Sequence, residues 1–583
     1  MTAALRAIPA AAAARRARPA TAAAGALLLI VLGWLVVYPL LLVLVDAVRT
    51  EATGAEALRA AGGWTLEYVR EFLRRPTEWR ALWDSFWISV VSVLLAGAIG
   101  IPLAVLFARY DFPGRRLLGA VIALPAVLPP LVGVVAFLFL YGESGFFARL
   151  VQAVFGLETA PWRLEGAGAI LMVHAYSMYV YFYLFTRAAL LSLDAAQLEA
   201  AASLGAGRWR TAQRVVLPAL APALTGGALL TFMTSLASFS APYIFGGGFR
   251  VMTTQIVATR LNGENALAMV ETVALSLLAL AALALFRGTD SGGYGAGGGS
   301  AVGAGTKGTA PAPAVVRHRG ARVALAVFSW SLAVVLLLPH LTLLVVSFVP
   351  LGTWTTEAIP PAWSLANYAA LVGDPVRLRP LLNSLWLATL ATAAAVALSL
   401  AAAALIVRRR VPGRRALDLL LALPWAVPGT VFAIALATAF SVWAPWFGRV
   451  VLIGTIWILP LAYLVRNLPI TSRATLAGFR ALDPSYDEAA ASLGAGHWRT
   501  LRRVTVPLLR PSLMAGATLA FVTALGDFVT SIVLYTYDTR PISLEILASL
   551  RQSDVGVAAA YGVVLMALSA AIFALGADWG GAG

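Results

Sequence analysis

The stretch EAAASLGAGRWRTAQRVVLP, residues 199–218, occurs a second time at 488–507 as EAAASLGAGHWRTLRRVTVP. Fifteen of the 20 positions are identical, and the alignment needs no gap. A shorter match, FPGRR at 112–116 and VPGRR at 411–415, extends the similarity toward the start of each copy. Matches at a constant spacing are the signature of an internal repeat. The sequence therefore predicts two structurally similar halves.

Each copy is typical of a helix, a turn and a second helix. Asp194 and Asp483 are suited to cap the first helix, because an aspartate oxygen accepts a free N–H group of the first turn. Gly205 and Gly494 come after it, and glycine adopts the positive φ that ends a helix without steric cost. These stretches, with their caps, are called here the repeat segments: 194–218 and 483–507.

The rest of the chain is dominated by apolar runs. Of its 583 residues 60% are hydrophobic and 12% are charged, whereas soluble proteins carry about 25% charged residues. Runs of about 20 apolar residues recur, and each is long enough to cross a bilayer as a helix. The runs do not alternate apolar with polar residues, which excludes barrel strands. The composition predicts an all-α membrane protein.

About 12 transmembrane helices are expected, in two parallel six-helix halves. In the first half the expected spans are 23–47, 84–107, 117–140, 167–189, 221–245 and 268–286. In the second half they are 323–349, 382–407, 417–440, 448–465, 511–535 and 556–576. The first run could also be a secretory signal, but it is longer than a signal core and shows no cleavage site, so we expect a retained span.

The arginines predict the orientation. The formal charge is +16, and the short loops 108–116 and 408–416 are rich in arginine. Cytoplasmic loops carry such an excess, so both termini are expected in the cytoplasm, and nucleic acid binding is not needed to explain the charge. The expected divisions are a cytoplasmic tail at 1–22, a first half at 23–286, a flexible Gly/Ala/Ser/Pro-rich linker at 287–322, and a second half at 323–583.

Both repeat segments are predicted to face the cytoplasm, where they would suit a partner with two-fold symmetry. Their alanine runs allow another surface to approach closely, and Glu199 or Glu488 supplies a charged anchor. The alternative is a pair of amphipathic helices lying on the inner membrane surface. The near-identity of the two copies, in halves that otherwise differ widely, favours a docking role.

At these residues the chain resembles the inner-membrane permeases of binding-protein-dependent ABC importers. Their signature is E-A-A, three residues, G, nine residues, then I-x-L-P. The first match consists of Glu199, Ala200, Ala201, Gly205, Val215, Leu217 and Pro218. The second consists of Glu488, Ala489, Ala490, Gly494, Val504, Val506 and Pro507. Valine replaces isoleucine and one leucine, which are conservative departures.

The resemblance implies a molybdate/maltose-permease-like helical fold in which the motif forms a coupling helix that docks on an ATPase. The coupling residues it implies are Glu199, Ala200, Ala201, Leu204, Gly205, Ala206, Glu488, Ala489, Ala490, Leu493, Gly494 and Ala495. It also implies two copies of a cytoplasmic ABC ATPase, a periplasmic or extracellular substrate-binding protein, and a place in the bacterial inner membrane. The fused two-half form resembles ferric-iron permeases, so ferric iron is the expected substrate; thiamine, phosphonate and polyamines remain open.

Apart from this resemblance, the residues themselves indicate that the chain does not hydrolyse ATP. A phosphate-binding loop needs G-x-x-x-x-G-K-[ST]. Lys307 is the only lysine, and it follows Thr306 outside any such motif. ATP and Mg are therefore expected on a partner chain, with no cofactor on this one. No catalytic constellation is evident, and we expect a non-catalytic subunit.

Ser238 and Asp527 occupy equivalent places in the two copies, and we hypothesise that both face the translocation path. An ionisable residue within an apolar span is costly and usually faces a cavity; the alternative for Asp527 is a carboxyl hydrogen-bonded between packed helices. Glu271 is expected to extend to the outer surface, the alternative being a position just inside the sixth span. His174 and the tyrosines around it are expected to pack, and the four histidines form no metal-ligand pattern.

Two other classes of protein remain as alternatives. A major-facilitator-type secondary transporter also has six plus six spans and a central linker. It would not need a long helical loop between the fourth and fifth spans of each half. A non-transporting membrane scaffold is the second alternative.

Overall fold

The computed structural model describes residues 19–50, 63–126, 129–289, 314–315, 318–354, 359–409, 411–441 and 450–581. Nearly all of these residues are helical, and the short parallel pair β1 (Tyr110–Asp111) and β2 (Ala314–Val315) is the only sheet among them. Most of the expected tail and linker lies outside the described residues. Helix α14 ends at Thr289 and α15 begins at Arg319, so both ends of the expected linker are helical.

The helices of the first half are α1 (Pro19–Leu32), α2 (Tyr38–Asp46), α3 (Glu67–Arg74), α4 (Pro76–Arg109), α5 (Arg115–Ala123), α6 (Pro130–Tyr141), α7 (Phe146–Phe155), α8 (Gly166–Leu191), α9 (Ala195–Ser203), α10 (Arg208–Thr211), α11 (Leu217–Leu236), α12 (Ser240–Phe245), α13 (Met252–Leu261) and α14 (Asn265–Thr289). One π-helical turn, η1 (Gly33–Val37), joins α1 to α2, and another, η4 (Ala212–Val216), joins α10 to α11. A 3₁₀ turn, η3 (Leu124–Ala126), follows α5.

The helices of the second half are α15 (Arg319–Val346), α16 (Ala366–Gly373), α17 (Pro375–Ala403), α18 (Arg414–Ala422), α19 (Gly429–Ala439), α20 (Ile458–Ala481), α21 (Ser485–Ser492), α22 (His497–Thr500), α23 (Val506–Leu525), α24 (Val529–Leu534), α25 (Ile542–Arg551) and α26 (Val555–Gly581). The π-helical turns are η5 (Ala404–Arg409) and η7 (Leu501–Thr505), and the 3₁₀ turns are η6 (Leu423–Trp425) and η8 (Tyr537–Thr539).

Ten helices in the described part of the chain are long and apolar enough to cross a membrane, or eleven if the bent pair α18 and α19 is one span. The twelfth place belongs to α20, which packs between α17 and α23 as α8 packs between α4 and α11. The span expected at 448–465 is therefore misplaced. Arg466, Asn467 and Arg473 lie within α20 and end the apolar run early, although the helix continues to Ala481.

The two halves repeat each other in detailed contacts. The backbone N–H of Met252, the first residue of α13, donates to Ser85 Oγ of α4 at 2.7 Å. In the second half the N–H of Ile542, which begins α25, donates to Ser384 Oγ of α17 at 2.8 Å. Both hydroxyls satisfy a helix N-terminus that has no partner within its own helix. The internal repeat of the sequence is thus a repeat of structure.

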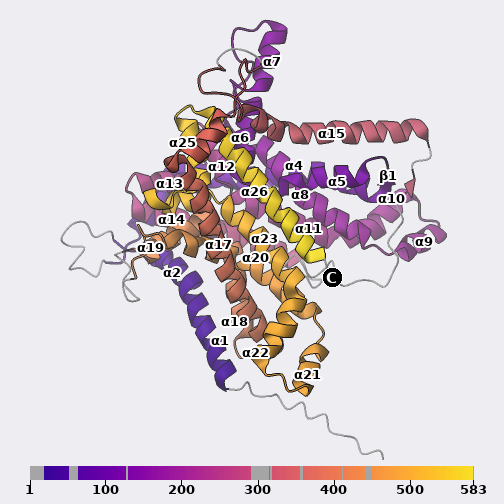
Figure 1. The fold of residues 1–583 in the computed structure, drawn as a ribbon, viewed down its shortest axis with the longest axis vertical. Helices are drawn as coiled ribbons and strands as arrows, with labels where there is room; N and C mark the ends of the chain where they lie inside the picture. The colour runs from indigo at the N-terminus through magenta and orange to yellow at the C-terminus, as the bar shows by residue number, and fades with distance from the viewer. Residues whose placement is uncertain are drawn as a thin grey trace, which may run out of the picture.

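The first span of each half packs against the other half. Helices α1 and α2 contact α18 and α19, whereas α15 contacts α5 and α6. In Figure 1 the indigo α1 and α2 accordingly run beside the orange second half, and α15 extends over the purple first half. The loop glycines that receive these helices are equivalent: Leu29 lies against Gly413, and Trp330 lies against Gly114. Both glycines have positive φ, at +80° and +82°.

The fifth span of each half is broken, contrary to the continuous spans expected at 221–245 and 511–535. Helix α11 ends at Leu236, and α12 starts again at Ser240. Helix α23 ends at Leu525, and α24 starts at Val529. Pro242 lies in the first turn of α12, where proline is tolerated. Ser238 and Asp527 lie in these breaks rather than within continuous spans.

Candidate coupling and translocation sites

The repeat segments form two matching helical elbows. Asp194 Oδ1 accepts the Ala196 N–H at 3.0 Å, and Asp483 Oδ1 accepts the Ser485 N–H at 2.8 Å, so both expected caps are present. That bond from Ser485 holds the pKa of Asp483 below its ordinary value. The turns have φ values of +75° at Gly205 and +76° at Gly494. As predicted, each segment is therefore helix, glycine turn, helix.

Large apolar side chains are exposed at the same places on both elbows. Leu204 is 87% exposed and Leu493 is 89% exposed, and Trp209 and Trp498 are each 73% exposed. An exposed apolar cluster rimmed by polar residues marks an interaction site. In Figure 1 the elbows, labelled α9 and α10 or α21 and α22, protrude from the body on the side away from α13 and α25.

The other expected coupling residues surround these side chains. The exposed ones are Glu199, Ala200, Gly205, Glu488, Ala489 and Gly494. Ala201, Ala206 and Ala495 are partly buried, and Ala490 is buried. The acidic and small residues of both segments are thus available to a partner on one side, while the alanines behind them pack on the permease.

The two elbows are attached to the body differently. In the second half Arg408 of η5 pairs with Asp487 at 3.1 Å and donates to the Leu482 carbonyl at 3.0 Å. In the first half the contact is apolar, a cluster of Ala108, Leu190, Leu193, Val216 and Leu220. Both attachments place the arginine-rich loop between the second and third spans on the same face as the elbow.

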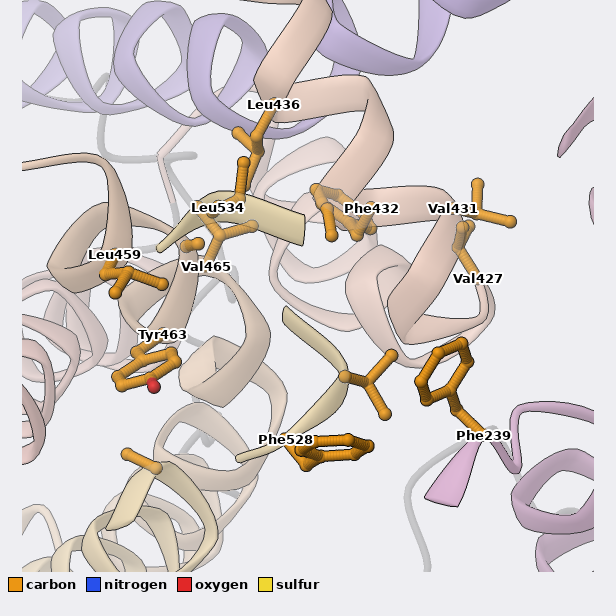
Figure 2. Packing of buried hydrophobic residues seen from close by; sticks show 14 of the residues in the cluster. Phe239, Val427, Val431, Phe432, Leu436, Leu459, Tyr463, Val465, Phe528 and Leu534 are labelled. Carbon is orange, nitrogen blue, oxygen red and sulfur yellow. The ribbon is translucent and has the colours of Figure 1, made fainter. Parts of the chain in front are cut away.

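Two equivalent phenylalanines meet between the halves. Phe239 and Phe528 are 289 residues apart, the same spacing as Glu199 and Glu488, and their ring centroids lie 5.7 Å apart. A residue that touches its own symmetry mate lies on the two-fold axis, which here is the pseudo-two-fold axis between the halves. Both rings are buried, and Figure 2 shows them entering one apolar cluster that also contains Val427 and Phe432. The interface is closed at this level.

Ser238 precedes Phe239 and belongs to a neutral polar cluster. His174 Nε2 lies 2.9 Å from Ser238 Oγ, and His174 Nδ1 lies 2.9 Å from Ser92 Oγ and 3.2 Å from Ser235 Oγ. The buried imidazole is therefore satisfied by three hydroxyl groups. Among the described residues no group of three or more His, Cys, Asp or Glu side chains could hold a metal ion.

Asp527 precedes Phe528 and is held in an ion pair. Its Oδ2 lies 3.0 Å from Arg466 Nη1, and its Oδ1 accepts the Thr530 N–H at 2.8 Å, which caps α24. The Asp527 side chain is 3% exposed, whereas the Arg466 side chain is 31% exposed. The carboxylate is thus bonded between helices, as the alternative interpretation expected, and the guanidinium has a free side. Sequence reasoning missed Arg466, because the expected span ended at residue 465.

A cavity of about 420 Å³ lies between the halves near these aromatic rings. Residues of α12 and α13 form one wall, and residues from α24 to α25 form the other. Arg551 of the second half donates to the hydroxyl of Tyr243 of the first across this gap. Tyr243 also stacks on Phe239, with ring centroids 5.1 Å apart. The elements that line the cavity follow α11 and α23, so the cavity lies beyond the aromatic pair as seen from the elbows.

Glu271 is fully buried, so the prediction that it extends to the outer surface is wrong. Its Oε1 accepts the Thr259 hydroxyl at 2.8 Å, and its carboxyl group also contacts that of Glu78. Oε2 of each glutamate has no hydrogen-bond partner. Helices α4, α13 and α14 enclose this pair of glutamates. The apolar pattern of a single span does not show which of its residues neighbouring helices will bury.

These features together define a membrane transport protein: paired helical bundles, a closed contact on their common axis, and two similar exposed elbows on one face. Comparison with known families agrees. Residues 100–290 and 394–577 match the family described as binding-protein-dependent transport system inner membrane component. The chain belongs to this family and is the permease of an ABC importer in its fused two-half form.

Three relatives show the range of the family. A probable ABC transporter permease of Sinorhizobium fredii is 30% identical over 93% of this chain and 94% of its own length. A ferric transport system permease of Actinobacillus pleuropneumoniae is 28% identical over 86% of this chain and 72% of its own. A molybdenum transport system permease of Escherichia coli is 37% identical, covering 29% of this chain and 72% of its own. The family assignment argues against the major-facilitator alternative.

Proposed function

We propose that this permease is driven by two copies of a cytoplasmic ABC ATPase, one docked on each repeat segment. The observation that carries the proposal is the duplicate exposure of Leu204 with Trp209 and of Leu493 with Trp498. Four large apolar side chains left in water cost about 1.5–3 kcal/mol each relative to burial. A partner that covers them recovers that free energy on both halves at once.

The proposed orientation places the elbows and both termini in the cytoplasm of a bacterial cell, with the permease in the inner membrane. The arginine-rich loops support it, because they lie on the same face as the elbows. A substrate-binding protein would then deliver the substrate to the opposite face, where the 420 Å³ cavity lies between the halves.

We place the translocation path on the pseudo-two-fold axis, with Phe239 and Phe528 as its closure. The axis is the only line that both halves border equally, and a contact there opens when the halves rotate apart. Ser238 and Asp527 directly precede the two rings and would come to line the opened path. Arg466, paired with Asp527, would present its free guanidinium side to the same space.

Ferric iron is the proposed substrate. The support is the fused two-half form, because the match to the ferric permease covers 86% of this chain and so spans both halves. Import of thiamine, phosphonate or polyamines would use the same machinery.

Reconstitution tests the proposal. The permease, a cognate ABC ATPase and a cognate substrate-binding protein would be combined in liposomes, and radioactive ferric iron uptake measured with ATP present or absent. We expect uptake only when all three proteins and ATP are present. Uptake of another solute under those conditions would reject iron as the substrate but leave the coupling role intact. A permease that binds no ATPase would reject the coupling role.

A further inference from the structure

A groove lies at the start of α15, where that helix crosses onto the first half. It encloses about 460 Å³ and is lined by Pro113, Arg319, Arg322, Val323, Ala326, Val327, Trp330 and Ser331. All but Pro113 come from one stripe of α15, because residues three and four apart share a helix face. Pro113 belongs to the loop after β1, and Trp330 lies against the adjacent Gly114. The groove therefore depends on the exchange of first helices between the halves.

The groove has a cationic end and an apolar wall. Arg319 and Arg322 are exposed, and neither pairs with a carboxylate of the described chain. Val323, Val327 and Trp330 continue the stripe, and all three are exposed apolar side chains. The N-terminus of α15, where His318 Nδ1 accepts the Ala321 N–H at 3.4 Å, adds partial positive charge beside the two guanidinium groups. An occupant that fits has an anionic head and a hydrocarbon tail.

The groove also lies at the level of a membrane surface. Loop 110–114 follows α4, whose end at Ala108 packs on the elbow of the first half. The charged end of the groove is thus on the elbow face, and the apolar stripe runs along α15 into the membrane. Basic pockets at the cytoplasmic ends of transmembrane helices bind anionic lipid headgroups.

We propose that this groove binds an anionic phospholipid, with its phosphate between Arg319 and Arg322 and an acyl chain along Val323, Val327 and Trp330. Assignment to the inner leaflet rests on the orientation proposed above. The linker is a poorer occupant, because Asp290 is the only aspartate or glutamate in residues 287–322, and it lies 29 residues before Arg319.

The test uses the full-length chain in detergent, without ATPase or substrate, so that its outcome does not depend on transport. Phosphatidylglycerol or phosphatidylcholine would be titrated, and bound lipid counted by native mass spectrometry. We expect phosphatidylglycerol to be retained, and the double variant Arg319→Gln, Arg322→Gln to bind it about tenfold more weakly or worse. The matched control Arg414→Gln, Arg415→Gln removes two exposed arginines from the same face and should bind as the parent does.

Two further experiments distinguish a phospholipid from a free phosphate as the ligand. Inorganic phosphate and glycerol 1-phosphate should bind at least tenfold more weakly than phosphatidylglycerol, since they lack the acyl chain. Ala326→Trp should reduce lipid binding by filling the groove while both arginines remain. Equal binding of phosphatidylcholine, equal binding of free phosphate, or unchanged lipid binding in the arginine double variant would overturn the proposal.

The leaflet is tested separately, because the chain has no cysteine and a single introduced one is a unique label. Ala321→Cys in whole spheroplasts should resist a membrane-impermeant maleimide and react after lysis. Labelling from outside would overturn the inner-leaflet assignment and the orientation, while the lipid counts would still decide the site itself.

Discussion

At the scale of residues, the two halves have chemically different side chains at equivalent positions beside the axis. Beside the axis, the first half has Ser238 bonded to a buried histidine, whereas the second half has Asp527 paired with Arg466. Position 177, which corresponds to 466, is a serine. The ionic arrangement is thus confined to one half, which makes the proposed path chemically asymmetric although its backbone is nearly two-fold.

The Asp527–Arg466 pair predicts a specific pattern of stability. Asp527→Ala should lower the free energy of unfolding by about 1–3 kcal/mol, because it removes the carboxylate that pairs with the half-buried Arg466 and accepts the Thr530 N–H of α24. The double variant Arg466→Ser, Asp527→Ser copies the first half and should cost less than Asp527→Ala. Thermal unfolding in detergent measures both, and a double variant less stable than the single one would contradict this account.

The buried carboxyl pair predicts a stabilising substitution. Glu271→Gln should raise the free energy of unfolding by about 1 kcal/mol, because an amide can donate to the unpartnered Oε2 of Glu78. Glu264→Gln is the control, since Glu264 is half exposed and already pairs with Arg75 at 2.7 Å. Melting temperatures of the three proteins provide the measurement. A lower melting temperature for Glu271→Gln would show that the second carboxyl group is needed.

At the scale of elements, the breaks between α11 and α12 and between α23 and α24 create the site. Each break brings a phenylalanine to the axis and a polar residue beside it. Broken helices near the middle of a membrane expose polar groups that a continuous helix would satisfy internally. The elbows are the other repeated element, and their exposed leucines point away from the body that carries the breaks.

The axial phenylalanines should act as a closure. Phe239→Ala with Phe528→Ala should raise ATP-independent leakage of a trapped small anion such as molybdate severalfold in liposomes that contain the permease alone. Phe479→Ala removes an equally buried ring of α20 away from the axis and should not leak. Because each substitution leaves a comparable cavity, equal leakage from the control would show that packing loss, rather than an open path, is responsible.

A charge introduced into the apolar surface of either elbow should weaken its binding to the ATPase. Leu204→Asp or Leu493→Asp should reduce ATPase capture at least tenfold, because a carboxylate would have to be buried in the contact. Leu351→Asp changes an exposed leucine beyond the far end of α15 and should leave capture unchanged. Co-purification of tagged permease with the ATPase measures the effect, and full capture by both elbow variants would exclude a role for these leucines.

At the scale of the whole molecule, the exchange of first helices ties the halves together. Residues 1–289 and 290–583, produced as separate chains in one cell, should therefore co-purify, because α1 and α2 need α18 and α19 to cover them, and α15 needs α5 and α6. Deleting residues 1–50 from the first chain should weaken the association. Halves that are stable alone and do not associate would contradict this arrangement.

Much of this architecture could be predicted from the sequence, and the missing parts have physical causes. The repeat segments, their caps and their glycine turns follow from local residue chemistry. The helix exchange does not, because apolar periodicity says that a face is buried but not which helix buries it. The breaks at Ser238 and Asp527 were hidden by apolar residues on either side. Arg466 was missed because a polar side chain ends an apolar run even when the helix continues.

Crosslinking of the elbows tests the central claim most directly. Leu204→Cys and Leu493→Cys would each be introduced singly into the cysteine-free chain, treated with a photoactivatable maleimide, and irradiated in membranes that contain the ATPase. The account predicts an ATPase adduct at both positions and none at Leu351→Cys on the opposite face. Adducts at neither elbow position, with an ATPase that still supports transport, would contradict it.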